Sequence, residues 1–218
     1  AEHLQTVAIV LTDQSLGQSR AVVDPPRTFD RDLPRILAAP ADEPYMRYEV
    51  TEDGVSPMSV PGMAGRMYTA DGLEHNPRGT PSSMAADHWA QMGKRRRKLE
   101  DFDFGPEWAE ISGSGSICLV TWGSSSGAVL EAAGYLTAAG RSIRVVVLRL
   151  LAPLRREALR EALNGAEQVL VVEQNHGAQL FLYLHSEQVL PSQALSLARP
   201  GPLPLRPREI IDALLRES

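Results

Sequence analysis

The pattern of apolar and polar residues changes twice along the chain. Residues 6–11, with the sequence TVAIVL, form a short apolar run rich in β-branched side chains, which is typical of a buried parallel strand. Residues 24–81 carry nine of the 16 prolines. Beyond residue 115, apolar runs alternate with segments of helical periodicity. The pattern predicts three stretches, residues 1–23, 24–112 and 113–218.

The third stretch predicts a small α/β domain. Its expected strands are residues 116–122, 143–148, 168–173 and 194–198, and its expected helices are residues 127–139, 154–163, 177–190 and 206–215. The strands are apolar without polar alternation, so both faces of a largely parallel sheet should be covered by helices. Gly140 and Gly165 stand where the first two helices should end with a positive φ.

The first two stretches need neighbours. A lone strand at residues 6–11 buries nothing, so we expect it to be the last element of a domain whose main body lies outside this chain. The prolines of residues 24–81 exclude long helices and central strands, because each one removes a backbone donor and fixes φ. Apolar residues between 45 and 60 predict an ordered connecting segment that packs against other parts of the protein.

One helix is expected near the end of the connecting segment. Ser82 or Ser83 should cap a helix over residues 84–92, which places Met84, His88 and Met92 on one face. The basic run KRRRK at residues 94–98 would follow at the C-terminal end, where the helix dipole favours positive charge. Such a run is typical of a solvated helix face, of a surface that contacts an acidic partner, or of a surface that contacts nucleic acid, and the last of these fits the sequence least. As an exposed patch, it should contribute little to stability.

The composition favours an ordinary soluble protein and argues against several other classes of protein. The 218 residues are 43% hydrophobic and 22% charged, as in ordinary soluble proteins. The sequence lacks an apolar run near the ~20 residues of a membrane span, and it opens without the features of a signal peptide, so the expected location is the cytoplasm. The net charge of -5 argues against general nucleic-acid binding. Cys118 should be a buried thiol, and one cysteine excludes an iron–sulfur cluster held by this chain alone.

Two loops of the third stretch carry candidate site residues. The loop from Trp122 leads from a strand into a helix N-terminus, where free N–H groups can hold an anion, through Gly123, Ser124, Ser125 and Ser126. A tight turn alone also explains this sequence. Glu173 and Asn175 follow the third strand at its carboxyl end, where Glu173 can accept hydrogen bonds from a loop and Asn175 can cap the next helix. The histidines show no metal-ligand spacing.

Four motifs extend over almost the whole chain. They are LTDQSLG at residues 11–17, TEDGVSP at 51–57, DGLEHNPRGTP at 71–81 and VVEQNHG at 171–177. With these motifs the chain resembles the C-terminal part of the alpha subunit of 2-oxoacid:ferredoxin oxidoreductases, particularly the 2-oxoglutarate type. The resemblance implies a transketolase C-terminal-like domain, preceded by the tail of a thiamine-binding-type domain of the pyrimidine class. It adds candidate interface or ligand-contact residues, which are Asp13, Gln14, Glu74, His75, Arg95 and Lys98.

The resemblance also implies an activity for the intact enzyme. Such enzymes oxidise a 2-oxoacid to acyl-coenzyme A and CO2 with thiamine diphosphate and Mg, and they reduce ferredoxin. A beta subunit and an iron–sulfur cluster in a partner chain are implied. The glutamate that activates thiamine lies in a domain preceding this segment, so the resemblance assigns no catalytic residue or cofactor to this chain, which should be inactive alone.

Two alternatives stay open. One is a non-catalytic α/β module for assembly or anion binding. The other is a nucleotide-binding domain that uses the loop at Gly123. Leu148 and Arg149 stand where a dinucleotide site would place an acidic residue, which counts against NAD.

Overall fold

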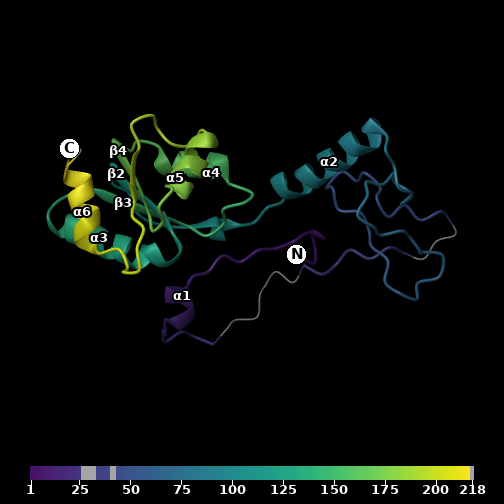
Figure 1. Cartoon of the computed structure of the whole chain (residues 1–218), viewed down its shortest axis with the longest axis horizontal. Coiled ribbons are helices and arrows are strands. Elements are labelled where there is room, and N and C mark those ends of the chain that lie inside the picture. The colour runs from purple at the N-terminus through teal and green to yellow at the C-terminus, as the bar shows by residue number, and fades with distance from the viewer. Residues whose placement is uncertain (26–32, 40–42, 217–218) are drawn as a thin grey trace. The chain divides into compact units, whose positions relative to one another are not determined.

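The computed structural model describes residues 1–25, 33–39 and 43–216, so Pro26 and Pro40 of the proline-rich segment lie outside the described residues. Contacts within the chain divide it into two units. The first comprises Ala1–Val10 and Val22–Asp103, and the second comprises Leu11–Ala21 and Phe104–Ser218. Figure 1 labels the elements of both units.

The second unit is built on one sheet of five strands. The strands are β1 (Ala109–Gly113), β2 (Ile117–Trp122), β3 (Ile143–Leu148), β4 (Gln168–Glu173) and β5 (Leu195–Ala198). Their order across the sheet is β1-β3-β2-β4-β5. Strands β3, β2, β4 and β5 pair in parallel, while β1 pairs antiparallel with β3.

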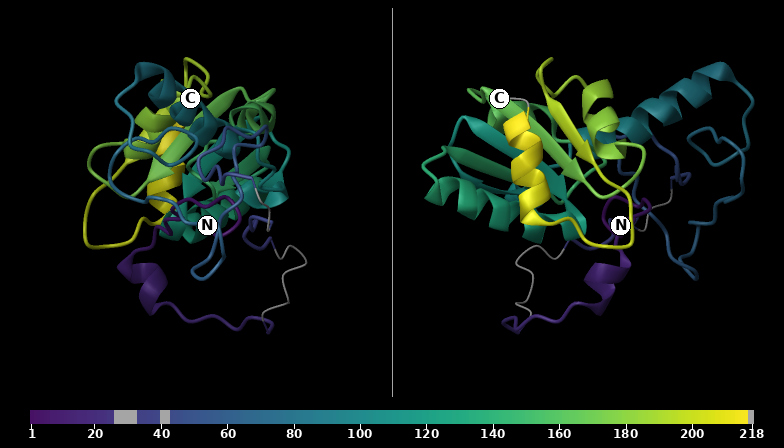
Figure 2. Two further views of the ribbon diagram at one scale, coloured as in Figure 1. Left: turned by 90° about the vertical axis from the view of Figure 1, so that its right-hand side faces the viewer. Right: turned by 60° about the vertical axis from the view of Figure 1, so that its left-hand side comes forward.

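Four helices cover this sheet on both faces, as Figures 1 and 2 show. They are α3 (Ser126–Ala138), α4 (Arg156–Leu163), α5 (Gln179–Ser186) and α6 (Pro207–Arg216). The side chains of α3 and α6 form one apolar cluster with the sheet, and those of α4 and α5 form another on its other face. The predicted α/β class, with helices on both faces of a largely parallel sheet, is confirmed.

The antiparallel strand β1 was not expected. Four of its five residues are exposed, because it pairs with β3 on one side only and forms an edge of the sheet. An edge strand with little burial needs no apolar run, and so it leaves no such signal in the sequence. The predicted helix ends at Gly140 and Gly165 are confirmed, with φ of +81° and +73°. Helix α5 is shorter than the predicted residues 177–190.

Cys118 lies in the middle of the sheet and is fully buried. Burial raises the pKa of its thiol to about 11. The thiol is therefore protonated at neutral pH, and it packs against the apolar side chains of α4 and α5. The prediction of a buried thiol is confirmed.

The apolar run at residues 6–11 does not form a strand in this structure. Val7, Ile9 and Val10 are exposed. A parallel strand depends on a neighbour for its hydrogen bonds, and among the described residues no strand pairs with this run. The sequence predicted the apolar character of the segment correctly but not its conformation. The short helix α1 (Gln14–Gln18) follows it and was not expected.

The first unit has one long helix among its described residues, α2 (Ala85–Glu100). It extends beyond the expected residues 84–92 and includes the whole basic run. Its N-cap is Met84 and not a serine, so the predicted cap is wrong. Ser82 instead accepts a hydrogen bond from the backbone N–H of Met84 and donates one to Asp87. The described residues of the proline-rich segment form only isolated bridges.

The side of α2 that faces the loops of the first unit is polar. Lys94 is only 6% exposed, and its Nζ donates to the carbonyl of Glu49 at 3.0 Å and to Oγ of Ser56 at 2.6 Å. The loop at Gly54 approaches the helix so closely that a Cβ there would lie 2.6 Å from the carbonyl oxygen of Lys94. Gly54 also has a φ of +75°, so this contact requires glycine.

Other basic residues of α2 also bind backbone carbonyls. Arg97 donates to the carbonyls of Glu52 and Thr51 at 2.8 and 2.7 Å. Lys98 donates to those of Leu4 and Gln5 at 2.8 and 3.1 Å. The expectation that the basic run is an exposed patch that contributes little to stability is therefore wrong for Lys94, Arg97 and Lys98. The basic groups supply donors to a segment that has no sheet to pair its carbonyls.

We expect Arg97→Ala to destabilise the first unit by about 1–2 kcal/mol, because two carbonyls lose a charged donor. Arg96→Ala is the matched control, since Arg96 is mostly exposed and pairs only with Glu100 of the same helix. Its loss should change the free energy of unfolding by less than about 0.5 kcal/mol. Urea unfolding with hydrogen exchange of the α2 amides measures both. Equal effects of the two substitutions would contradict the structural role of Arg97.

Stability of the first unit should rise with pH in the alkaline range. Burial lowers the pKa of Lys94 from 10.5 to about 8. Between these values the unfolded chain keeps a proton that the folded chain has released, so the free energy of unfolding increases as pH rises, by up to about 3 kcal/mol. Urea unfolding at pH 7.5 to 9.5 tests this. Lys94→Met should remove most of the slope, and an unchanged slope in this variant would show that another group causes it.

Candidate functional site

The second unit has one topological switch point. From β2 the chain crosses through α3 to β3 on one side, and from β4 it crosses through α5 to β5 on the other side. The carboxyl ends of β2 and β4 are adjacent, and the connections after them leave in opposite directions. In open α/β sheets this is the place where ligands bind.

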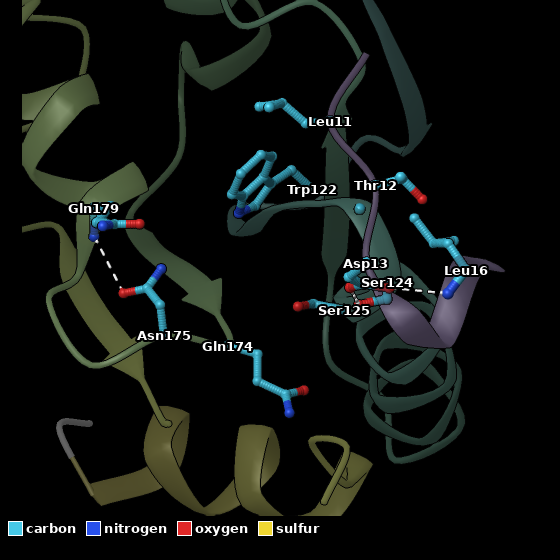
Figure 3. A pocket seen from close by; sticks show the side chains of 11 residues that line it. Leu11, Thr12, Asp13, Leu16, Trp122, Ser124, Ser125, Gln174, Asn175 and Gln179 are labelled. Carbon is cyan, nitrogen blue, oxygen red and sulfur yellow. Dashed lines mark hydrogen bonds between the residues drawn. The ribbon is translucent and has the colours of Figure 1, made fainter. Parts of the chain in front are cut away.

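A pocket of about 220 Å³ lies at this switch point (Figure 3). One wall follows β2 and one follows β4, while the third comes from the segment before and within α1. The lining residues are Leu11, Thr12, Asp13, Leu16, Trp122, Gly123, Ser124, Ser125, Gln174, Asn175 and Gln179. The sheet therefore brings the two loops that the sequence singled out to one place.

The loop after β2 forms one wall of the pocket. Gly123 has a φ of +58°, which lets the chain turn through a short 3-10 helix into α3. Ser126 closes this turn, since its hydroxyl donates to the carbonyl of Gly123 at 2.6 Å. Ser125 is 5% exposed, and its hydroxyl points into the pocket. Ser124 instead donates to the carboxylate of Asp13.

Asp13 connects the segment from Leu11 to Ala21 with this loop. It is the N-cap of α1, accepting a hydrogen bond from the backbone N–H of Leu16 at 2.9 Å. The hydrogen bonds of Ser124 and Leu16 hold the pKa of Asp13 below its usual value, so the carboxylate is ionised at neutral pH. Gln14, the other candidate of this motif, is exposed at the start of α1 and does not line the pocket.

Glu173 turns away from the pocket and organises the loop after β4. Its carboxylate is fully buried and accepts hydrogen bonds from the backbone N–H groups of Leu180 and Phe181 at 2.7 and 3.0 Å. The side-chain amide of Asn175 donates to the same carboxylate at 2.5 Å. Glu173 thus binds the N-terminal turn of α5, where a negative charge is stabilised by the helix dipole.

Asn175 also reaches the first turn of α5. Its side-chain oxygen accepts a long hydrogen bond of 3.4 Å from the backbone N–H of Gln179. The N-cap itself is Ala178, at a φ of +48° and without a side-chain cap. Asn175 therefore supports the helix start from a position outside the cap.

Glu74 and Arg95 belong to a separate cluster in the first unit. Glu74 accepts hydrogen bonds from His88 at 2.8 Å and from Arg95 at 2.5 Å. Burial by itself raises the pKa of Glu74, but these hydrogen bonds outweigh it and hold the pKa below its usual value. The cluster attaches the loop at residues 71–81 to α2.

His75 is buried beside this cluster. Its ring stacks on Tyr48 at 4.4 Å between the ring centroids, with parallel planes. Nε2 of His75 lies 3.2 Å from Oδ1 of Asp71. The positions of Glu74, His75, Arg95 and Lys98 thus give them contacts inside the first unit, and none of them lines the pocket.

The sequence did not single out several lining residues. Trp122 was read only as the end of a strand, and Gln174 and Gln179 only as neighbours of other candidates. The signal was available for Trp122 and Gln174, which lie at the carboxyl ends of two predicted strands, the edge where such sheets bind ligands. Gln179 lies inside the predicted helix of residues 177–190. Leu11, Thr12 and Leu16 belong to the motif at residues 11–17, but the sequence did not indicate that they meet this edge of the sheet, since their place depends on a contact between distant parts of the chain.

The described residues, 1–25, 33–39 and 43–216, form neither a metal-binding cluster nor a membrane-spanning helix. These residues contain no group of three or more histidine, cysteine, aspartate or glutamate side chains that could hold a metal ion. None of the helices they form is both long enough and apolar enough to span a bilayer.

The chain is similar to known proteins along nearly its whole length. Residues 107–179 match the family described as transketolase, C-terminal domain. The alpha subunit of 2-oxoacid:ferredoxin oxidoreductase from Saccharolobus solfataricus is 31% identical over 189 residues, which is 82% of this chain and 29% of the relative. The alpha subunit of 2-oxoacid:ferredoxin oxidoreductase 2 from Aeropyrum pernix is 33% identical over 226 residues, 99% of this chain and 34% of the relative.

A solved structure agrees with these relatives. It is the 2-oxoglutarate:ferredoxin oxidoreductase from Magnetococcus marinus, with 2-oxoglutarate, coenzyme A and succinyl-CoA bound. It is 29% identical, matches with a TM-score of 0.76, and the match covers 88% of this chain and 34% of that one. The chain therefore spans about a third of the length of the proteins it matches.

Glu173→Ala should destabilise the second unit by about 3 kcal/mol, because three buried donors lose a charged acceptor. Glu167→Ala is the control, because Glu167 directly precedes β4, is exposed and accepts a side-chain hydrogen bond only from Ser116. Its effect should stay within about 0.5 kcal/mol. Urea unfolding followed by circular dichroism compares the two. If Glu173→Ala unfolds at the same urea concentration as the control, the carboxylate does not hold α5.

Proposed function

The chain is homologous to the C-terminal part of the alpha subunits of 2-oxoacid:ferredoxin oxidoreductases, and we propose that it acts as part of such an enzyme. The assembled enzyme would oxidise a 2-oxoacid, 2-oxoglutarate or a relative of it, to acyl-coenzyme A and CO2, with ferredoxin as the electron acceptor. The role of this chain is to contribute assembly and subunit contacts, including contacts with a beta subunit.

The observation that carries the proposal is the extent of the similarity. The match to the Aeropyrum pernix subunit covers 99% of this chain, so it includes the irregular first unit as well as the α/β unit. An α/β unit alone is compatible with many functions. An irregular unit built around a basic helix is a more particular feature, and its presence beside the transketolase-type domain supports descent from one kind of subunit.

The exposed surface of the first unit supports a role in assembly. Val7, Ile9 and Val10 are exposed one after another, and Trp89 is 78% exposed on α2. Val7, Ile9 and Val10 lie close together along the chain, and such groups of exposed apolar side chains mark surfaces that other protein covers. We infer that residues 6–11 become a strand when the rest of the enzyme supplies a neighbour.

The proposed cofactors do not fit the pocket of this chain. Thiamine diphosphate needs a cation to hold its diphosphate, but the lining residues include no lysine, no arginine and, apart from Asp13, no carboxylate that could bind magnesium. We therefore assign thiamine diphosphate and Mg to other parts of the assembled enzyme, and the iron–sulfur cluster to a partner chain. The chain itself supplies no reacting group to the proposed chemistry.

The proposal predicts activity only in assembly. The purified chain should not turn over 2-oxoglutarate with thiamine diphosphate, Mg, coenzyme A and a viologen acceptor. A tagged copy should co-purify with the beta subunit of the same oxidoreductase when the two are co-expressed with the remainder of the alpha subunit. Turnover by the chain alone above a control without protein would sink the proposal, and so would a failure of the chain to enter the complex.

Arg96 provides a sharper variant for this test. The side chain of Arg96 is 74% exposed, against 48% for Arg95, and it pairs with Glu100 of the same helix. Its loss should therefore leave the fold intact. If α2 faces an acidic partner surface, Arg96→Ala should weaken the association, and more so at low salt, where screening is least. Association that is unchanged at every salt concentration would remove α2 from the interface.

A further inference from the structure

The pocket at the switch point contains hydrogen-bond donors that the described residues do not satisfy. Ser125 is 95% removed from solvent, since its exposed fraction is 5%. Figure 3 shows its hydroxyl pointing into the pocket, and no described residue forms a hydrogen bond with it. The small exposed part of Ser125 includes this hydroxyl, so it is reachable from the pocket and free to donate to a ligand or to water. Ser125 is the first sign that the pocket is built to receive an acceptor.

Helix α3 adds a second, independent source of positive potential. It is 13 residues long, begins at Ser126 directly after the pocket lining, and has no side-chain cap. The N–H of Ser126 donates to the carbonyl of Gly123 in the preceding 3-10 turn, so only the next N–H groups of the first turn remain for a ligand. The helix dipole favours negative charge at this end. Free backbone donors and the Ser125 hydroxyl therefore meet at one end of the pocket.

Two more donors line the pocket from other elements. The indole N–H of Trp122 and the side-chain amide of Gln179 have no hydrogen-bond partner among the described residues. Figure 3 draws the oxygen of the Gln179 amide toward the space, and rotation of the amide by 180° turns its N–H groups there. Figure 3 shows Gln179 on the opposite wall from Ser125. Donors that converge from β2, α3 and α5 on one space suit a ligand with several acceptor oxygens.

The charges around the pocket limit which ligand it can take. No lysine or arginine lines it, and the ionised carboxylate of Asp13, which accepts a hydrogen bond from Ser124, is one of the lining groups. Asp13 repels a doubly charged phosphate about twice as strongly as a singly charged carboxylate, and no cation in the lining offsets this repulsion, so the pocket favours the lower charge. The volume of about 220 Å³ admits a small molecule and not a dinucleotide.

We propose that this pocket binds the carboxylate of a small organic acid, held by Ser125, the start of α3 and the donors of Trp122 and Gln179. Leu11 and Leu16 offer apolar contacts to a short carbon chain. The site lies wholly in the second unit, so binding does not depend on the function proposed above. It would be a property of the isolated chain.

Titration of the purified full chain tests the proposal. Acetate, 2-oxoglutarate and inorganic phosphate are added at constant ionic strength with chloride, and the backbone amide shifts of residues 123–127 are followed by NMR. Acetate should shift these amides with a saturable curve. Ser125→Ala should weaken acetate binding by about tenfold or more, because a hydrogen bond to a charged group is lost.

A second variant predicts the opposite sign. Asp13→Asn removes the nearby negative charge and keeps the shape of the side chain, so acetate should bind severalfold more tightly. Ser186→Ala is the matched control, because the hydroxyl of Ser186 donates to the carbonyl of Tyr183 on α5, away from the pocket lining. It should leave the affinity for acetate unchanged.

Several outcomes would overturn the proposal. One is the absence of a saturable shift up to roughly 100 mM acetate, where even millimolar affinity would be evident. Another is phosphate binding more tightly than acetate at pH 8, where phosphate is mostly doubly charged. If Ser125→Ala fails to fold, Asp13→Asn still decides, since weaker or unchanged acetate binding in that variant contradicts the site. None of these outcomes bears on co-purification with the beta subunit.

Discussion

The pairing of buried backbone groups is the constraint on which this structure depends. In the first unit the chain is too rich in proline to form a sheet, so its carbonyls need donors from elsewhere. Helix α2 supplies them through Lys94, Arg97 and Lys98. This reverses the usual arrangement of a surface helix, because the side that packs against the protein is charged while Trp89 stays exposed.

The second unit meets the same constraint with the opposite charge. The loop after β4 cannot pair the first N–H groups of α5, and the buried carboxylate of Glu173 accepts two of them. Glu173 is turned inward and does not line the pocket, whereas Gln174 and Asn175 of the same loop do. One buried carboxyl side chain thus fixes a helix end and, through it, one wall of the pocket.

These arrangements fit a chain that supports chemistry carried out by other parts of an enzyme. Its charged residues are largely engaged in holding loops and helix ends, and the donors left over at the switch point are neutral. An α/β unit with a small polar pocket and an irregular unit with exposed apolar groups are suited to contacts with other protein. The similarity to alpha subunits of 2-oxoacid:ferredoxin oxidoreductases agrees with a role in subunit contacts.

The sequence by itself determined the strands and helices of residues 116–216, the burial of Cys118 and the edge of the sheet that carries the pocket. These features are set by local periodicity, which survives in the sequence whatever the rest of the chain does. Only the tertiary structure decided that Lys94 is buried, that β1 joins the edge antiparallel, and that Asp13 meets Ser124 from 111 residues away. The conformation of residues 6–11 also depends on neighbours. Charged side chains and edge strands take their partners through long-range contacts, which leave no local period to read.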